Sequence, residues 1–266
     1  MIRLGVNSVL FQGHDLATAM QHIAWAGYDG IEVSAIKGMC EHLDLDHWRE
    51  QADSIRSLAA ENHLALLSME VASLDEDRLT KAFEAGLAIG IPVINIGPGG
   101  KSDIETDFVA QVGTIARLAE KAAGYGVALC CKAHVGGSIY NTPTTLRAMD
   151  LIRAPSFGVD MDPSHVYRAG EDPAQALPAV LSRVKHVHIR DCKGRGPSPG
   201  EPRDQACGRG DIDLYGYFKA MVAGRYDGPV CLEVIGAGKL DLPRRDIIAS
   251  ESFGYMNACL KALGGR

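Results

Sequence analysis

The sequence lacks the features that mark membrane or secreted proteins. No apolar stretch approaches the ~18 residues that a helix needs to cross a bilayer. The segment from Met1 to Asn7 is too short and too soon polar for a signal peptide. The seven cysteines are odd in number and include no Cys-x-x-Cys pair of the zinc type. We therefore expect a cytoplasmic protein with reduced, buried thiols that does not contact a membrane.

An excess of basic residues, which nucleic-acid-binding surfaces usually need, is also missing. The 27 Lys and Arg residues are outnumbered by 33 Asp and Glu residues, which gives a formal net charge of -6. A small-molecule substrate is the expected ligand. The hydrophobic content of 46% is enough for a full core, and a chain of 266 residues suits one α/β barrel.

A glycine-rich phosphate loop is a third missing feature. A doubly wound open sheet normally carries such a loop after its first strand, and none follows Asn7. The segment 97–102, Gly-Pro-Gly-Gly-Lys-Ser, is similar in composition, but Asn95 stands where the first glycine of a phosphate loop would be. The open sheet is therefore the less favoured fold.

Short apolar runs alternate with segments of helical periodicity along the whole chain. The runs read as strands are 2–7, 30–33, 64–70, 92–96, 127–132, 157–161, 184–189 and 229–234. Helices are expected from about Leu16, capped by Asp15, and then over 45–62, 76–87, 107–125, 144–152, 173–181, 214–222 and 242–263. Eight such units predict a closed (β/α)8 TIM barrel, with residues 1–266 as one domain.

Polar residues stand at the end of every apolar run, and in such barrels the active site lies at the C-terminal ends of the strands. These residues are Asn7, Glu32, Glu70, Asn95, Lys132, His134, Asp162, His165, His188, Arg190 and Glu233. A single one can be a satisfied core group, but a full ring predicts a polar pocket. We expect Asn7, Glu32, Glu70, His165 and Arg190 to contact the substrate.

Side chains alternate between the two faces of a strand, so His186, His188 and Arg190 point the same way. We expect His188, nearer the strand end, to reach the substrate, and His186 to pack one layer below. Asp162 and His165 flank a short predicted turn that can aim both side chains at one pocket.

Three of the strand-end residues suggest a metal site. Asp162, His188 and Glu233 close consecutive apolar runs, and carboxylates with an imidazole at such positions favour a divalent metal. The preceding run ends in Lys132, where a carboxylate would complete the set. The lysine makes the presence of a metal an open question.

The sequence resembles the sugar-phosphate isomerase/epimerase family of xylose isomerase-like barrels over essentially its whole length. The most specific segments are Gly-Val-Asp-Met-Asp-Pro-Ser-His (158–165), His-Val-His-Ile-Arg-Asp (186–191), Cys-Gly-Arg-Gly-Asp-Ile-Asp (207–213) and Tyr-Asp-Gly-Pro-Val-Cys-Leu-Glu (226–233). Each motif is weak alone, but their shared order is specific for the superfamily. None of them identifies a substrate.

The resemblance implies one Mn, Mg, Co or Zn ion held by Glu, Asp, His and Glu from strands five to eight. Asp162, His188 and Glu233 match the last three ligands, and His165 matches a residue that contacts substrate hydroxyls. In the family the two ligand glutamates also serve as acid and base beside a ketose carbonyl. The first of them is replaced here by Lys132.

Two arrangements are compatible with Lys132. Three carboxylates, a neutral histidine and a divalent ion sum to a charge of -1, and so do Lys132, Asp162, Glu233 and a neutral His188 without an ion. The ammonium can therefore replace the ion electrostatically. Alternatively, a metal stays on Asp162, His188 and Glu233, with water or substrate filling its coordination shell.

Three functions follow as hypotheses. The first is an isomerase or epimerase of a keto-sugar or polyol derivative, assisted by a divalent metal, with Glu233, Lys132 and His134 as catalytic groups. The second is a keto-sugar lyase or dehydratase in which Lys132 or His134 is the base. The third is a non-catalytic barrel that binds a sugar or a partner protein. The family resemblance also suggests a homodimer or homotetramer.

A basic segment beyond the seventh strand gives one indication about the substrate. Its cations are Arg190, Lys193, Arg195, Arg203 and Arg209. Such a cluster suits a phosphate or carboxylate group, but exposed Lys and Arg residues are common on any surface.

Overall fold

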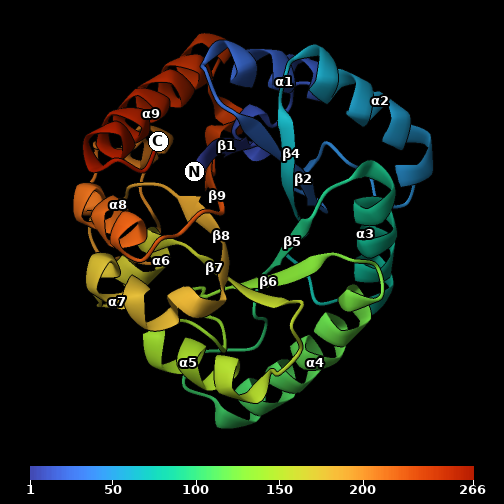
Figure 1. The fold of residues 1–266 in the computed structure, drawn as a ribbon, viewed down its shortest axis with the longest axis vertical. Helices are drawn as coiled ribbons and strands as arrows, with labels where there is room; N and C mark the ends of the chain where they lie inside the picture. The colour runs from blue at the N-terminus through green and yellow to red at the C-terminus, as the bar shows by residue number, and fades with distance from the viewer.

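Parallel strands hydrogen-bond side by side in a closed ring in the computed structural model, which describes residues 1–266 (Figure 1). The strands are β1 (Arg3–Asn7), β2 (Gly30–Ile36), β4 (Ala65–Glu70), β5 (Val93–Ile96), β6 (Ala128–Lys132), β7 (Phe157–Met161), β8 (Val184–Ile189) and β9 (Pro229–Leu232). β1 pairs with both β2 and β9, which closes the ring. The predicted (β/α)8 barrel is confirmed.

Helices surround the ring and follow the strands in sequence (Figure 1). They are α1 (Leu16–Trp25), α2 (Trp48–Glu61), α3 (Glu76–Ile89), α4 (Glu105–Ala123), α5 (Thr142–Leu151), α6 (Pro163–Arg168), α7 (Pro173–Val180), α8 (Leu214–Ala223) and α9 (Leu242–Leu263). The bounds differ from the predicted ones by a few residues. Asp15 caps α1 as expected, because its carboxylate accepts a hydrogen bond from the Thr18 amide at 2.8 Å.

The structure adds elements that the apolar pattern did not indicate. A two-residue strand, β3 (Cys40–Glu41), pairs antiparallel with the end of β2. Four short 3-10 helices are η1 (Ser8–Phe11), η2 (Leu181–Arg183), η3 (Pro202–Gln205) and η4 (Ala237–Lys239). The turn predicted between Asp162 and His165 is instead the start of α6. Pro163 suits the first helical position because its fixed φ fits the helix and its missing amide needs no partner there.

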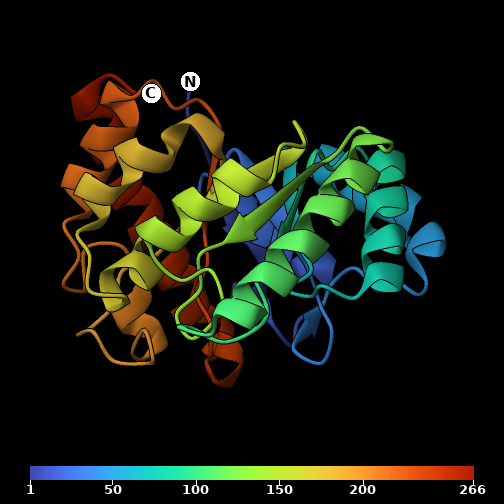
Figure 2. The ribbon, with the colours of Figure 1, turned by 90° about the horizontal axis from the view of Figure 1, so that it is seen from below.

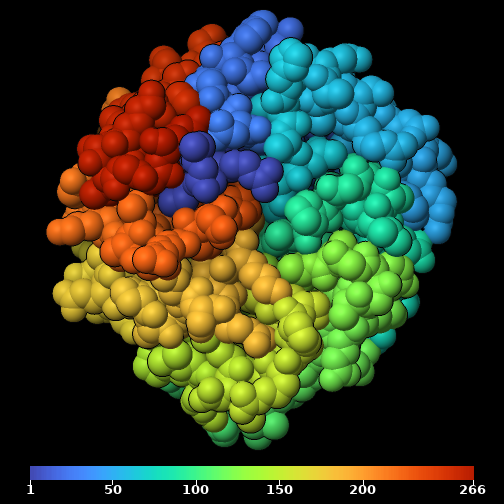
Figure 3. Space-filling view, in the orientation of Figure 1, coloured from blue at the N-terminus to red at the C-terminus, as the bar shows by residue number.

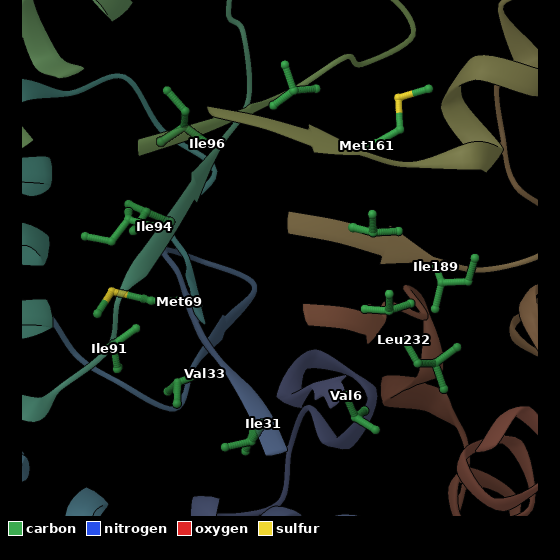
Figure 4. Packing of buried hydrophobic residues seen from close by; sticks show 14 of the residues in the cluster. Val6, Ile31, Val33, Met69, Ile91, Ile94, Ile96, Met161, Ile189 and Leu232 are labelled. Carbon is green, nitrogen blue, oxygen red and sulfur yellow. The ribbon is translucent and has the colours of Figure 1, made fainter. Parts of the chain in front are cut away.

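The strands place apolar side chains outside the barrel and polar ones inside. Val6, Met69, Ile94 and Ile189 lie beside strand residues that face the barrel axis, and they point outward to the helices (Figure 4). They belong to a core cluster of 72 buried residues between strands and helices. The alternate positions carry most of the polar strand-end residues, so the barrel interior is polar toward one end.

Both chain termini lie at the opposite end of the barrel from the site. Figure 2 shows N and C together at one end, while the blue hairpin formed by β2 and β3 extends at the other end. The space-filling view looks at the end with the termini, where the N-terminal residues (dark blue) lie near the centre beside α9 (red) (Figure 3). None of the helices has the length and apolar character that crossing a membrane requires.

We predict that Gly30→Ala destabilises the barrel, because an added Cβ would lie 2.4 Å from the Ala65 carbonyl oxygen on the neighbouring strand. Overpacking of this kind lowers the free energy of unfolding by about 1–3 kcal/mol. Gly113→Ala in α4 is the matched control, since nothing lies within 4 Å of its added Cβ. The control is expected to raise stability by up to ~1 kcal/mol through helix propensity. Urea denaturation of both variants checks this, and a Gly30→Ala protein as stable as the wild type would contradict it.

Candidate active site

A pocket of about 220 Å³ opens at the C-terminal ends of the strands. Its lining residues are Ile36, Met39, Glu70, Ala72, Gly97, Lys132, His134, His165, Arg168, Arg190, Pro197, Pro199, Glu233 and Ile235. A larger surface hollow of about 470 Å³ between η3 and α9 contains none of the polar strand-end residues. The smaller pocket is therefore the candidate active site, since it collects six of the residues that the sequence pointed to.

Lys132 lies between two carboxyl groups at the floor of this pocket. Its Nζ is 3.1 Å from Glu70 Oε1 and 3.0 and 3.1 Å from the two oxygens of Glu233. Burial disfavours the ammonium, but Glu233 and Glu70 outweigh it and raise the pKa of Lys132 above its usual value. Lys132 therefore carries a positive charge between two carboxyl groups, which disfavours the roles of base and Schiff-base nucleophile for it.

Arg190 connects the other carboxylates of the site. Its Nη2 donates a hydrogen bond to Asp162 Oδ2 at 2.9 Å, and its Nε donates to Ser164 Oγ at 2.8 Å. Its Nη1 is 3.0 Å from Glu233 Oε2, but this buried nitrogen makes no aligned hydrogen bond. We interpret the Nη1 contact as charge attraction, which leaves donor capacity at the pocket wall.

Burial raises the pKa of most carboxylates, and the two acids beside Lys132 respond in opposite ways. Burial opposes ionisation of Glu233, but Arg190 and Lys132 outweigh it and hold its pKa well below the usual range. For Glu70, burial and the neighbouring Glu233 charge raise the pKa to about 8. Glu70 therefore holds a proton at neutral pH, while Glu233 stays ionised.

A second polar layer lies beneath the pocket, around Glu32. Glu32 accepts hydrogen bonds from Asn7 Nδ2 at 2.9 Å and from Asn95 Nδ2 at 2.6 Å, and it contacts His188 Nε2. Asn7 also donates to Glu70 Oε2 at 2.5 Å, which links the two layers. Asn7, Glu32 and His188 are fully buried and do not line the pocket. The predicted substrate contacts of Asn7 and Glu32, and the expected reach of His188, do not match this placement.

Asp160 holds both histidines of β8 in this lower layer. Its Oδ1 is 2.9 Å from His186 Nδ1, and its Oδ2 is 2.6 Å from His188 Nδ1 at an angle too oblique for a hydrogen bond. Burial opposes a charged His188, but Asp160 and Glu32 outweigh it and raise its pKa well above the usual value. His188 is therefore an imidazolium between two carboxylates. His186 also contacts Ser68 Oγ at 2.9 Å, so its predicted place below the substrate layer agrees with the structure.

The rings of His134 and His165 pack against each other at the pocket wall, with centroids 4.1 Å apart and planes tilted by 38°. His165 Nδ1 accepts a hydrogen bond from the Val135 amide at 3.1 Å, and its Nε2 lies 2.9 Å from Arg190 Nη2, so donors approach both ring nitrogens. His134 Nδ1 is 2.9 Å from the Val135 carbonyl oxygen, which can only accept, so Nδ1 must carry the proton. Nε2 of His134 is left with a free lone pair. Desolvation and the nearby Lys132 charge lower the pKa of His134, which keeps this nitrogen unprotonated.

Three groups of buried side chains could hold a metal ion by the closeness of their ligand atoms. They are Glu32–His186–Cys231, Asp160–His186–His188 and Glu32–Glu70–His188. None of these groups contains Asp162 or Glu233.

A divalent ion does not fit the set formed by Asp162, His188 and Glu233 in this arrangement. Lys132 and Arg190 already supply positive charge to Glu233 and Asp162. Both nitrogens of His188 face carboxylates, so neither offers a free lone pair to a metal. The ligand roles given to these three residues stay a prediction from the family resemblance.

The sequence model of the xylose isomerase-like TIM barrels matches residues 20–259. The chain belongs to this family. It is 25% identical over 247 residues to a 3-dehydroshikimate dehydratase of Pseudomonas aeruginosa, which covers 86% of this chain and 38% of the relative. It is 27% identical over 130 residues to an inosose dehydratase of Clostridium perfringens, covering 44% of this chain and 43% of the relative. This xylose isomerase-like barrel therefore spans about two fifths of the length of these relatives.

A solved structure of D-psicose 3-epimerase with D-tagatose, from Clostridium cellulolyticum, shares the fold of this family member. Its TM-score is 0.78 at 15% sequence identity, and the match covers 97% of this chain and 99% of that one. At such low identity the likeness establishes the barrel alone.

Sequence reasoning missed three polar residues of the site. Asp160 and Ser68 lie two residues before the recognised strand-end residues Asp162 and Glu70, so the alternation of strand side chains already places each on the inner face. Arg168 follows His165 by three residues, a spacing that faces the same side once the segment is helical. It was missed because that segment was interpreted as a turn.

We predict that Glu70→Gln changes how stability depends on pH. The folded pKa of about 8 lies above the usual value of 4.5 for a glutamic acid, so folded Glu70 keeps a proton that the unfolded chain releases. Stability of the wild type should therefore fall as pH rises from about 4.5 to about 8. Chemical denaturation between these limits should show Glu70→Gln gaining stability relative to the wild type with rising pH. If the free energy of unfolding changed with pH in the same way for both proteins, the protonated state of Glu70 would be contradicted.

Proposed function

We propose that this barrel is a dehydratase that removes a proton beside the carbonyl group of a polyhydroxylated ketone and then expels water. The observation that carries the proposal is the free Nε2 of His134, which lines the same pocket as the Lys132 ammonium and the Glu70 carboxyl group. These three groups can serve as base, electrostatic stabiliser and acid. The names of the two relatives, dehydratases of 3-dehydroshikimate and of inosose, support an elimination.

The first step is proton abstraction by His134. Nε2 takes the proton from the carbon next to the carbonyl, and the electron pair of that C–H bond moves to the carbonyl oxygen. Lys132 and the free donor of Arg190 are the cations that stabilise the resulting negative charge. A positioned general base of this kind contributes roughly 10²–10⁴-fold to a rate.

The second step breaks the bond between the next carbon and its hydroxyl group. The enolate electrons form the carbon–carbon double bond, and Glu70 gives its proton to the departing hydroxyl, so that water leaves and a conjugated enone remains. The raised pKa of Glu70, about 8, keeps that proton available at neutral pH. His134 then loses its proton to solvent, and Glu70 is protonated again.

Isomerisation or epimerisation, the first function that the sequence suggested, shares the proton abstraction but ends differently. An epimerase must return a proton to the opposite face of the same carbon, and the family pairs two glutamates for this. Here Lys132 stands in place of one glutamate, and Glu233 is bound by two cations that make it a weak base. These contacts favour elimination over epimerisation.

The proposed activity is tested with keto-sugars and cyclic keto-polyols, including 3-dehydroshikimate and an inosose. In D₂O, NMR should show loss of the proton beside the carbonyl, and an ultraviolet absorbance should report the conjugated enone. His134→Asn should lower the rate about 100-fold or more, because the base is removed. His63→Asn is the control, since His63 is exposed and has a φ of 55°, which Asn tolerates.

Exchange of the proton beside the carbonyl for deuterium, without formation of the enone, would instead identify an epimerase or isomerase. Neither exchange nor product with any compound would favour the non-catalytic barrel. Circular dichroism of His134→Asn checks that the variant is folded.

We further propose that the Lys132 ammonium takes the place of the metal that the family resemblance implies. Treatment with EDTA should leave turnover unchanged, because no step uses a bound ion. Lys132→Glu should abolish activity and increase the affinity for Mn²⁺ in titration calorimetry, since it adds a carboxylate beside Glu70 and Glu233. Lys219→Glu, the same charge change at an exposed position of α8, should alter neither. Activity that EDTA removes and Mn²⁺ restores would refute the replacement.

A further inference from the structure

Three cations line the candidate pocket, and one of them lacks a carboxylate partner. Lys132 is paired with Glu70 and Glu233, and Arg190 is paired with Asp162 and Glu233. Arg168 is only 9% exposed and forms no ion pair. A buried charge without a counter-charge is unfavourable, so such a group points to an anion that arrives with a ligand.

The contacts of Arg168 are all with neutral acceptors. Its Nε donates to the Ser164 carbonyl oxygen at 3.1 Å, its Nη1 to the Pro197 carbonyl oxygen at 2.7 Å, and its Nη2 to His165 Nδ1 at 3.0 Å. A guanidinium has five N–H donors. Nη1 contacts only the Pro197 carbonyl and Nη2 only the His165 ring, so each terminal nitrogen keeps an N–H group that can donate to a carboxylate or phosphate.

The side chain is also held in place before any ligand binds. Asp162 caps α6 by accepting from the Ser164 amide at 2.8 Å, which fixes the start of the helix that carries Arg168. The Pro197 contact comes from the loop after β8, so the guanidinium is held between two segments. Preorganisation of this kind reduces the entropy lost on binding.

The charges of the pocket lining support the same conclusion. With Glu70 protonated, Lys132, Arg168 and Arg190 give three positive charges against the carboxylates of Glu233 and of Asp162, the partner of Arg190, which leaves an excess of one positive charge. Of the cations that the sequence suggested for this purpose, Arg190 lines the pocket, whereas Lys193 is paired with Asp211 and Arg209 with Glu251 outside it.

We infer that the ligand of this pocket carries a carboxylate or phosphate group that pairs with Arg168. As a statement about the substrate, this rests on the proposed function and narrows it to anionic polyhydroxylated ketones. As a statement about binding, the inference does not require that the protein catalyses a reaction. Its test therefore uses compounds that cannot react.

The probes are D-gluconate, D-glucitol and D-glucitol 6-phosphate, which share a six-carbon polyol chain and differ in their anionic group. In titration calorimetry at constant ionic strength, the wild type should bind one of the anions about ten-fold or more tightly than glucitol. Whether gluconate or the phosphate binds more tightly identifies the group. Arg168→Gln should lose the preference while its affinity for glucitol is unchanged.

Arg168→Lys should keep part of the preference, because it retains the charge but not the paired donors. Arg49→Gln, at an exposed arginine of α2 paired with Glu84, is the control and should behave as the wild type. Thermal melts check that each variant is folded. Equal affinities of the wild type for all three probes, no anion binding by the wild type, or an undiminished preference in Arg168→Gln would each overturn the inference. Failure of the proposed dehydration alone would leave these binding results unaffected.

Discussion

The neutralisation of buried acidic side chains is the constraint on which the rest of this barrel depends. The acidic residues buried around the strand ends are Glu32, Glu70, Asp160, Asp162, Asp191 and Glu233. Isolated buried carboxylates are strongly unfavourable, so each must find a cation, a proton or several hydrogen-bond donors. Lys132, Arg190 and protonated His188 supply the cations, Glu70 keeps a proton, and Asn7 and Asn95 donate hydrogen bonds. This need to neutralise buried carboxyl groups explains why the strand-end residues contact one another so extensively.

The contacts of these buried carboxyl groups divide the barrel interior into two layers with different functions. The lower layer, around Glu32 and Asp160, is fully buried, and its side chains contact one another rather than the pocket. It positions the upper layer through the Asn7–Glu70 contact and through the β8 backbone, where the His188 amide donates to Asp160 at 3.0 Å. The upper layer keeps unused hydrogen-bonding groups, which are a ring nitrogen of His134 and N–H donors of Arg190 and Arg168. Chemistry and ligand recognition are therefore expected in the upper layer only.

Membership of the xylose isomerase-like barrels does not by itself define the chemistry. The barrel supplies eight strand ends that converge on one pocket, and different residues there support different reactions. In this chain a lysine stands where the family resemblance implies a glutamate, and it holds two carboxyl groups together at the pocket floor. Because those carboxyl groups then differ in protonation, one acid and one permanent anion lie side by side. The protonated Glu70 is the acid of the elimination that we propose, whose base is His134.

The sequence by itself determined the barrel, the strand ends and most of the pocket, because these depend on local patterns. Alternation of apolar runs and helical periodicity predicted the eight units, and the polar residue closing each run predicted Lys132, His165, Arg190 and Glu233 as neighbours. Only the tertiary structure decided which polar residues reach the pocket and which lie beneath it, since depth along the axis depends on the register between strands. The pairs that Lys132 forms join residues 62 and 101 positions apart in the chain, so no local pattern could specify them. The missing partner of Arg168 is likewise a property of the packed interior alone.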